Sequence, residues 1–324
     1  MKNVLVTGAG GFIGSHLTEL LVEKGLNVKA FVHYNSQNNW GWLESSPCKN
    51  EIEVVTGDIR DSDSVRSAVQ NTDTVFHLAA LIGIPYSYVS PLAYIKTNIE
   101  GTYNILQSAL ECGIENLMIT STSEIYGTAQ YIPIDEKHPA VGQSPYSATK
   151  IAADEIALSY SRSFNLPVKI VRPFNTYGPR QSARAVIPTV ISQLLNGKRK
   201  IQLGNLTPTR DLTFVKDTAR GFFEIAGSDK LFGEATNIGM KNEISIDELV
   251  RLIGSFLDCE IEVISDHKRI RPEQSEVERL LCDNSKIMTH TNWTPAYNLE
   301  TGLKETIHWI EKNLNLYKSE LYNV

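Results

Sequence analysis

Residues 4–14 read VLVTGAGGFIG, and this stretch decides the fold. Val4, Leu5 and Val6 form an unbroken apolar run that predicts a strand, and the glycines that follow predict a sharp turn. The residues up to about Lys24 have the pattern of an amphipathic helix. A strand that is apolar throughout is typical of the centre of a parallel sheet, where both faces are covered.

Short apolar runs and helical stretches continue to alternate outward from this unit. Strands are expected at about 28–32, 53–56, 74–78, 116–121 and 168–172, and further helices near 91–111 and 146–164. This rhythm is typical of βαβ units. We therefore expect an α/β fold built on a doubly wound parallel sheet, the Rossmann arrangement.

The glycine turn also indicates a dinucleotide site. Glycine allows the backbone to turn sharply and to approach a pyrophosphate, whose charge the N-terminus of the following helix stabilises. The strand, turn and helix occur here in the order that such a site requires. Taken alone, the glycines would also fit a tight turn in another doubly wound protein.

The pattern changes after Arg172. Proline and glycine become frequent, the elements shorten, and a closing helix is expected near 298–313. We expect residues 1–176 to form a dinucleotide-binding domain, rejoined by about 211–242. Residues 177–210 and 243–324 would then form a smaller α/β domain for the substrate.

Composition excludes several classes of protein. Among 324 residues, 31 basic and 37 acidic side chains give a net charge of −6, so no global field would gather nucleic acid. The longest apolar stretch, 75–86, is interrupted and too short to span a membrane. The first residues lack the pattern of a secretory leader. The four cysteines lie far apart without a Cys-x-x-Cys pair, which argues against disulfides and zinc and favours a reducing cytoplasm.

Tyr146 and Lys150 are candidates for acid–base chemistry. They are four residues apart in a predicted helix, so both project from one face. A lysine cation within reach would stabilise the phenolate and lower the pKa of Tyr146, making it a general base. The pair occurs by chance in many helices, but its position downstream of Ser121 and Thr122 strengthens the interpretation.

These features together resemble the extended short-chain dehydrogenase/reductase family. The resemblance rests on the spacing of Gly8, Gly11 and Gly14 and on Thr122, Tyr146 and Lys150 in that order. Two further motifs support it, Gly57-Asp58-Ile59 and His77-Leu78-Ala79-Ala80. It implies an NAD(P) cofactor. The implied contacts are Gly8, Gly11, Phe12, Ile13, Gly14, Asp58, Ile59, Leu78, Ala79, Ala80, Tyr146 and Lys150. His77, beside the last loop, is interpreted as a packed histidine.

The end of the second strand bears on the choice between NAD and NADP. A carboxylate there would bind the ribose 2′-hydroxyl and repel a 2′-phosphate. This chain has no acid in the segment, and His33, Asn35 and Ser36 are able to donate to a phosphate. NADP is therefore weakly favoured, although an ordinary polar loop would have the same composition.

Glu124 indicates the reaction. In sugar-nucleotide 4-epimerases that resemble this chain, the residue at the position of Glu124 usually has a small side chain. In sugar-nucleotide 4,6-dehydratases, a carboxylate at this position removes the C5 proton of the sugar. Ser123 stands where many dTDP-glucose-type dehydratases have an aspartate that protonates the leaving C6 hydroxyl. The sequence Thr122-Ser123-Glu124 resembles the GDP-mannose 4,6-dehydratases instead. There Glu124 would also supply the proton, and Ser123 would at most orient or relay it.

The second half of the chain resembles the substrate-binding part of the same family. Arginine suits a diphosphate because its planar fork donates two parallel bonds. The residues implied in substrate binding are Asn175, Arg184, Arg210, Arg271 and Glu273. Residues 126–130, 144–146 and 181–184 are similar to the LegB-type N-acetylglucosamine nucleotide 4,6-dehydratases of legionaminic acid biosynthesis. This implies UDP- or GDP-N-acetylglucosamine as the substrate.

Three hypotheses follow. The leading one is a 4,6-dehydratase, a lyase with an internal redox cycle; the others are an NAD-dependent 4-epimerase and a non-catalytic NAD(P)-binding regulator. Glu124 favours the first over the second, and intact Tyr146 and Lys150 argue against the third. The helices near 91–111 and 146–164 resemble those that pair in the family, which implies a homodimer or a tetramer.

Overall fold

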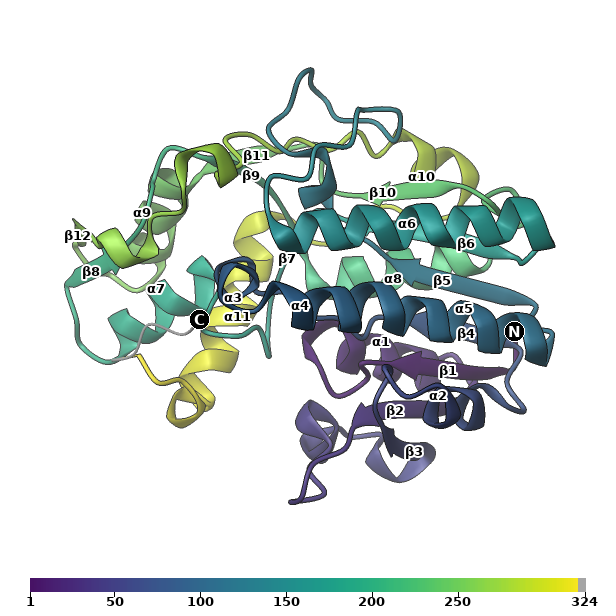
Figure 1. The fold of residues 1–324 in the computed structure, drawn as a ribbon. Coiled ribbons are helices and arrows are strands. Elements are labelled where there is room, and N and C mark those ends of the chain that lie inside the picture. The colour runs from purple at the N-terminus through teal and green to yellow at the C-terminus, as the bar shows by residue number, and fades with distance from the viewer. Residues whose placement is uncertain (320–324) are drawn as a thin grey trace.

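Seven parallel strands form the central sheet of the computed structural model, which describes residues 1–319 (Figure 1). Their order is β10-β6-β5-β4-β1-β2-β3. The bounds are β1 Asn3–Thr7, β2 Asn27–His33, β3 Ile52–Gly57, β4 Thr74–His77, β5 Asn116–Thr120, β6 Val168–Pro173 and β10 Ala235–Ile238. β1 pairs with β2 on one side and β4 on the other, so its prediction as a central strand is confirmed.

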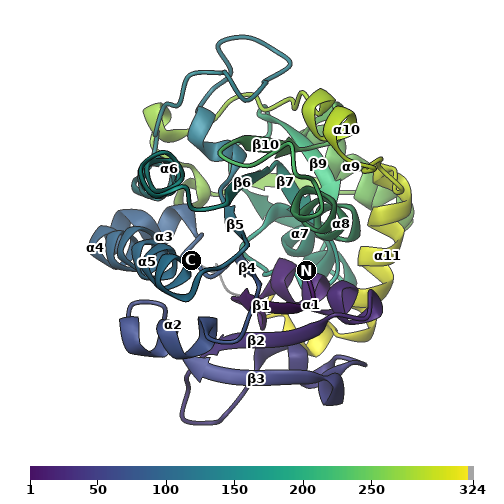
Figure 2. The same cartoon turned by 90° about the vertical axis from the view of Figure 1, so that its right-hand side faces the viewer.

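Helices cover both faces of this sheet (Figure 2). One face carries α1 (Phe12–Glu23) and α8 (Val215–Ala226), and the other carries α2 (Ser62–Val69), α5 (Gly101–Cys112) and α6 (Pro145–Phe164). The doubly wound fold is thereby confirmed. The chain order reverses between β1 and β4, and ligands of such sheets bind at the carboxyl ends of the strands at this point.

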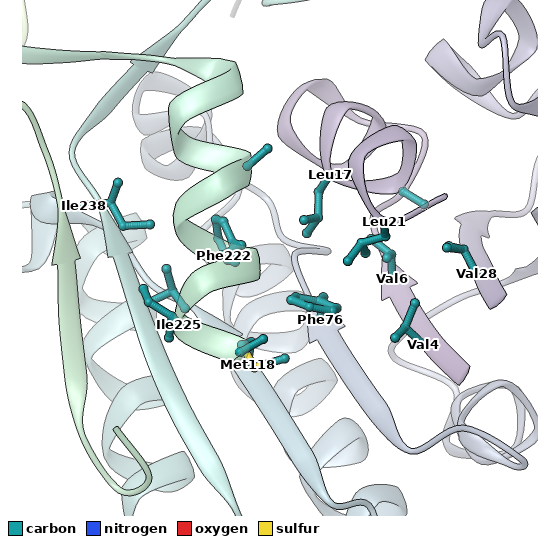
Figure 3. Packing of buried hydrophobic residues seen from close by; sticks show 14 of the residues in the cluster. Val4, Val6, Leu17, Leu21, Val28, Phe76, Met118, Phe222, Ile225 and Ile238 are labelled. Atoms are coloured by element: carbon teal, nitrogen blue, oxygen red, sulfur yellow. The ribbon is translucent and has the colours of Figure 1, made fainter. Parts of the chain in front are cut away.

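Strand β1 divides its side chains between two cores. Val4 and Val6 pack with Leu17 of α1 and Phe222 of α8 in one cluster (Figure 3), whereas Leu5 belongs to the cluster beneath α2, α5 and α6. All of them are fully buried. Burial of one such side chain contributes about 1.5–3 kcal/mol, so the glycine turn that follows β1 starts from a fixed strand.

The helix expected near 91–111 has a different geometry in its middle. It begins as α4 (Pro91–Tyr94), widens into a π-helical turn, η3 (Ile95–Glu100), and continues as α5. Such turns occur frequently at functional sites. Here the turn directs Asn98 at Leu81: its side chain accepts from the Leu81 N–H and donates to the Leu81 carbonyl, both at 2.9 Å.

The remaining strands form two small sheets. One contains β7 (Asn175–Tyr177), β9 (Thr209–Phe214) and β11 (Glu243–Ser245), and the other pairs β8 (Lys200–Leu203) with β12 (Glu262–Ser265). The helices α7 (Val186–Leu195), α9 (Ile246–Phe256) and α11 (Leu299–Lys312) share a third core beside them. The remaining helical elements are α3 Ile84–Val89, α10 Ser285–His290, η1 Gly41–Ser45, η2 Lys49–Glu51, η4 Ser123–Tyr126, η5 His267–Arg269, η6 Glu273–Ser275 and η7 Leu314–Leu316.

The division into two domains remains a proposal. β10 joins the central sheet, as the expected return of the chain at about 211–242 requires. Two features of the range 243–324 also lie with the dinucleotide-binding part: α10 lies beside β10, and Trp293 packs in the core of α1 and α8. We propose that the dinucleotide-binding part includes α10 and Trp293. Residues 320–324 of the second range lie outside the described residues. Within residues 1–319, no helix is long and apolar enough to cross a membrane.

Candidate active site

The glycine turn and the loop after β4 touch at the carboxyl end of the sheet. Gly8 has a φ of +68°, and a Cβ there would lie 2.8 Å from the Ala79 nitrogen. A Cβ on Gly14 would lie 2.2 Å from the Gly8 carbonyl oxygen. Both positions therefore require glycine, one for its conformation and both for the close approach.

The N-terminus of α1 is open to an anion. Gly11 is its N-cap and offers no side chain, and the first turn, with Phe12 and Ile13, contains no acid. The unpaired N–H groups of a first turn and the helix dipole favour a negative charge. The narrow glycine cradle and this uncapped end fit the pyrophosphate of NAD(P).

His77 belongs to a buried chain of hydrogen bonds at the same place. The Thr102 hydroxyl donates to the backbone carbonyl of Asn98, so its oxygen accepts from Nε2 of His77. Nδ1 of His77 accepts from the Thr7 hydroxyl. The Thr7 oxygen in turn accepts from the N–H groups of Leu78 and Ala79. Burial, aided by the charge of Lys150, lowers the pKa of His77 to about 3. His77 is therefore a neutral packed residue that helps to fix the loop.

The end of β2 offers fewer donors than the sequence indicated. Asn35 donates to the Asn39 carbonyl and accepts two backbone N–H groups of its own loop, so its amide is already used. His33 and Ser36 are exposed. At the end of β3, Asp58 is paired with Arg60, which lowers the pKa of its carboxyl group.

Tyr146 and Lys150 both lie buried on α6. The helix begins at a capping box between Ser144 and Ser147, which fixes Tyr146 in the first turn. Burial raises the pKa of Tyr146, and a hydrogen bond with Thr122 lowers it only in part. Burial also lowers the pKa of Lys150 to about 8, and its ammonium donates to the Thr120 carbonyl at 2.6 Å.

One expectation is therefore corrected. In the folded protein, the pKa of Tyr146 lies above its ordinary value and not below it. Loss of solvent around the buried phenol outweighs the influences that lower the pKa. The lysine charge is directed at the end of β5. Its electrostatic partner is Asp154, one further turn along α6.

Asp154 was not singled out from the sequence. Its Oδ2 accepts from the Ser121 hydroxyl at 2.8 Å and from the Arg172 Nε at 3.2 Å, while Arg172 also donates to the Tyr126 phenol. Within residues 1–319, Oδ1 of Asp154 is buried without a hydrogen-bond partner. The spacing of four residues from Lys150 could have indicated this residue.

The catalytic candidates after β5 converge on the same region. Thr122 caps η4, and its oxygen accepts from the Glu124 N–H at 3.2 Å, while Ser123 is buried. The charge of Glu124 acts on both Tyr146 and Arg210: it raises the pKa of the phenol and counteracts the lowering of the Arg210 pKa by burial. The fold thus brings a carboxylate, a phenol and a guanidinium together from three segments.

The substrate candidates line the side formed by the second part of the chain. Arg210 and Arg271 share one carboxylate oxygen, Oε1 of Glu276, at 3.3 Å each. Glu276 was missed from the sequence. Glu273, which was predicted instead, is exposed and has no hydrogen bond to either arginine within the described residues.

Two further candidates lie near Tyr146. The guanidinium of Arg184 lies beside Gly83. A Cβ added to Gly83 would lie 3.0 Å from Nη1 of Arg184 and 3.5 Å from the Tyr94 hydroxyl. Tyr94 meets the Tyr146 ring edge-on, with centroids 6.3 Å apart. The Asn175 Oδ1, on β7, is buried and has no hydrogen-bond partner in residues 1–319, so it is able to receive a ligand donor.

This fold and site define an extended short-chain dehydrogenase/reductase, an enzyme of the class that epimerises or dehydrates nucleotide sugars. The chain belongs to the GDP-mannose 4,6 dehydratase family, which it matches over residues 5–306.

Similar proteins include both reactions. The chain is 31% identical to a putative UDP-glucose 4-epimerase of Methanocaldococcus jannaschii, covering 96% of this chain and 99% of that protein. It is 32% identical to the dTDP-D-glucose 4,6-dehydratase of Mus musculus, covering 98% and 91%. The crystal structure of DesIV, a dTDP-glucose 4,6-dehydratase from Streptomyces venezuelae with NAD bound, superposes with a TM-score of 0.88 at 27% identity, covering 98% and 99%. A nicotinamide cofactor is thereby supported.

Proposed function

We propose that the protein is a lyase that catalyses 4,6-dehydration of a nucleotide-linked hexose to the 4-keto-6-deoxy sugar nucleotide. The observation that carries this proposal is the place of Glu124: it lies in the first turn of η4, its N–H donates to the Thr122 hydroxyl oxygen at 3.2 Å, and its charge acts on both Tyr146 and Arg210. An epimerase takes a hydride from C4 and returns it to the other face, so it needs no second base. A carboxylate at this point suits removal of the C5 proton.

The residues would act in sequence. Tyr146 takes the proton of the C4 hydroxyl, with Thr122 hydrogen-bonded to its phenol and the Lys150 ammonium held one turn further along α6 at the Thr120 carbonyl. The glycine turn with Gly8, Gly11 and Gly14 would hold NAD(P), which would supply a hydride acceptor at C4 and a hydride donor at C6. Glu124 removes the C5 proton of the 4-keto sugar and then donates it to the C6 hydroxyl, which leaves as water. Hydride addition at C6 is completed by protonation of C5, which gives the 4-keto-6-deoxy product. Each positioned acid or base contributes about 10²- to 10⁴-fold to the rate.

The proposed substrate is UDP- or GDP-N-acetylglucosamine, as in the LegB-type enzymes of legionaminic acid biosynthesis. Ile84, Tyr94 and Tyr146 form an apolar cluster with Leu81 and Tyr88 packed against it. Such a wall is able to accommodate an acetamido methyl group. Incubating the purified protein with each nucleotide sugar and weighing the product tests the proposal, because dehydration removes one water.

A 4-epimerase is the second candidate, and the similar putative UDP-glucose 4-epimerase favours it. The same experiment separates the two reactions. A product of unchanged mass whose C4 configuration is inverted would support the epimerase and contradict the dehydratase. A dehydrated product would do the reverse.

We propose that NADP binds at least as tightly as NAD. The end of β2 carries no acid, and His33 and Ser36 remain exposed, although the Asn35 amide is occupied. Titration of the cofactor-free protein with both dinucleotides tests this. NAD binding tighter by tenfold, about 1.4 kcal/mol, would overturn the preference.

We also propose a cytoplasmic homodimer, with a tetramer as the larger alternative. Leu92, Ile95 and Tyr103 are 61%, 47% and 45% exposed along α4, η3 and α5, which is much apolar surface for one helical segment. All four cysteines are free, as in a reducing compartment. Light scattering should give twice the chain mass, and Leu92→Asp should reduce it to the chain mass.

A further inference from the structure

Two arginines and one glutamate form a compact charged cluster on the substrate side of the site. The guanidinium groups of Arg210 and Arg271 each donate to Oε1 of Glu276 at 3.3 Å. Arg210 comes from β9, whereas Arg271 and Glu276 come from the segment around η6, about sixty residues later. A single carboxylate oxygen thus joins two cations from separate parts of the chain.

The backbone of Glu276 is held by the catalytic side of the site. Its carbonyl accepts from the Gln143 amide at 3.3 Å and from the Thr128 hydroxyl at 3.4 Å. Gln143 also accepts from the Thr128 N–H, which joins the two donors. Both lie between η4, which contains Glu124, and α6, which contains Tyr146. The position of the glutamate is therefore set relative to the reacting groups.

The arginines need such a partner. Arg210 is only 8% exposed, and a buried cation is costly unless it is paired. Two guanidinium groups that converge without an anion between them also repel each other. Glu276 removes both penalties, and Arg210 keeps its ion pair there although Glu124 lies within electrostatic range.

We propose that Glu276 is a positioning residue that holds Arg210 and Arg271 together as one binding unit for the diphosphate of the nucleotide sugar. The inference rests on the proposed function in so far as the ligand is a nucleoside diphosphate sugar. It assigns Glu276 no contact with the sugar. The two arginines and Glu276 together carry a net charge of +1. Nη1 of Arg210 also donates to the Thr209 carbonyl, and the N–H groups that make neither bond would be left for the two phosphates.

The sign of the effect separates positioning from simple counter-charge. A carboxylate beside a diphosphate repels it, so if Glu276 contributed only its charge, removing that charge would tighten binding. If Glu276 positions the arginines, removing it lets them separate, and binding weakens despite the more positive site. The two possibilities predict opposite changes in Kd.

The experiment uses the full chain loaded with cofactor and titrates it with UDP, GDP and the corresponding monophosphates by calorimetry. Glu276→Ala should raise the Kd of the preferred diphosphate about tenfold, by loss of bidentate arginine contacts, and that of the monophosphate much less. Glu276→Gln should lose less, because its amide oxygen still accepts one guanidinium N–H. Glu278→Gln is the matched charge control: this exposed carboxylate acts on Arg210 only through its charge, so its removal should not weaken diphosphate binding.

Turnover provides a second readout. Glu276→Ala should raise KM about as much as Kd and change kcat by less than about threefold, because the chemical step is not touched. Cofactor affinity should stay at the wild-type value, which shows that the variant is folded. Should Glu276→Ala fail to fold, Glu276→Gln carries the test.

Several results would overturn the inference: diphosphate binding in Glu276→Ala that is unchanged or tighter, an equal loss for mono- and diphosphates, or no diphosphate binding by the wild type. Failure of the proposed function looks different. If the wild type binds UDP or GDP and depends on Glu276 but forms no dehydrated product, the positioning role stands and the dehydratase proposal fails.

Discussion

The buried ammonium of Lys150 donates a hydrogen bond to the carbonyl of Thr120, the last residue of β5, at 2.6 Å. The lysine is thereby fixed two residues before Thr122, which contacts the phenol of Tyr146. This bond joins helix α6 to strand β5 at the proposed site of reaction. The cation thus has a fixed position before any ligand binds, which is the condition for electrostatic stabilisation without reorganisation.

The first prediction concerns this pair. Tyr146→Phe and Lys150→Met should each slow the first hydride transfer by about 10²- to 10⁴-fold, because the C4 hydroxyl loses its base or the cation beside it. Single-turnover reduction of bound cofactor measures the step. An unchanged rate in Tyr146→Phe would remove tyrosine from the mechanism.

The second prediction concerns Glu124. Glu124→Gln keeps the shape and hydrogen-bonding capacity of the side chain but loses the basic carboxylate, so oxidation at C4 should persist while water is not released. Bound cofactor should accumulate in its reduced form, and C5 should no longer exchange with deuterated solvent. Retained cofactor binding is the control. Normal dehydration in this variant would show that Glu124 is not the base.

The third prediction tests the glycine cradle. Gly14→Ala should weaken cofactor binding more than tenfold, because its Cβ would have to lie 2.2 Å from the Gly8 carbonyl oxygen. Gly227→Ala is the matched control, since the nearest atom to an added Cβ there is 3.6 Å away and its φ is negative. Dinucleotide titration measures both. Equal affinities would contradict the cradle as described.

The fourth prediction concerns the ion pair beneath Lys150. Asp154→Asn should destabilise the protein by about 3–5 kcal/mol, because Arg172 is left buried without a compensating charge. Asp247→Asn, which breaks the exposed pair with Arg251, should leave the stability almost unchanged. Urea denaturation gives both values. Similar small losses would mean that the Arg172 charge is compensated elsewhere.

The fifth prediction is a dependence of stability on pH. The pKa of His77 is about 3 in the folded protein against an ordinary value of 6.5, so the unfolded chain binds the additional proton between these values. Folding stability from His77 is therefore complete above pH 6.5 and is lost as the pH falls toward 3, by on the order of 5 kcal/mol in all.

The difference between wild type and His77→Asn isolates this contribution, because Asp211, whose pKa is raised to about 6, titrates in both proteins. The unfolding free energy of the wild type should fall more steeply between pH 6.5 and 4 than that of the variant. Parallel curves would show that His77 keeps its ordinary pKa in the folded protein.

The sequence predicted the sheet and the cofactor side better than the substrate side. The strand at Val4–Val6, the glycine turn and the Tyr146 helix are local patterns, and each appears where its period and turn residues indicated. Glu276 and Asp154 depend on contacts with distant segments. Glu273 and Glu276 are three residues apart around η6. Glu276 lies between the buried Ser275 and Val277 and contacts the arginines, whereas Glu273 is exposed, and the sequence pattern alone does not separate the two carboxylates.

The π-helical turn at Ile95–Glu100 makes the position of Asn98 depend on the number of residues in this stretch. A π turn is an α-helix that carries one additional residue, so deleting one residue there would restore regular winding and rotate Asn98 by about 100° relative to α5. Asn98 would then lose Leu81 and also Thr149 of α6, to which it donates at 3.0 Å. This stretch should therefore tolerate many substitutions on its outer side but no deletion, and a related chain that lacks the extra residue must brace the loop after β4 by other means.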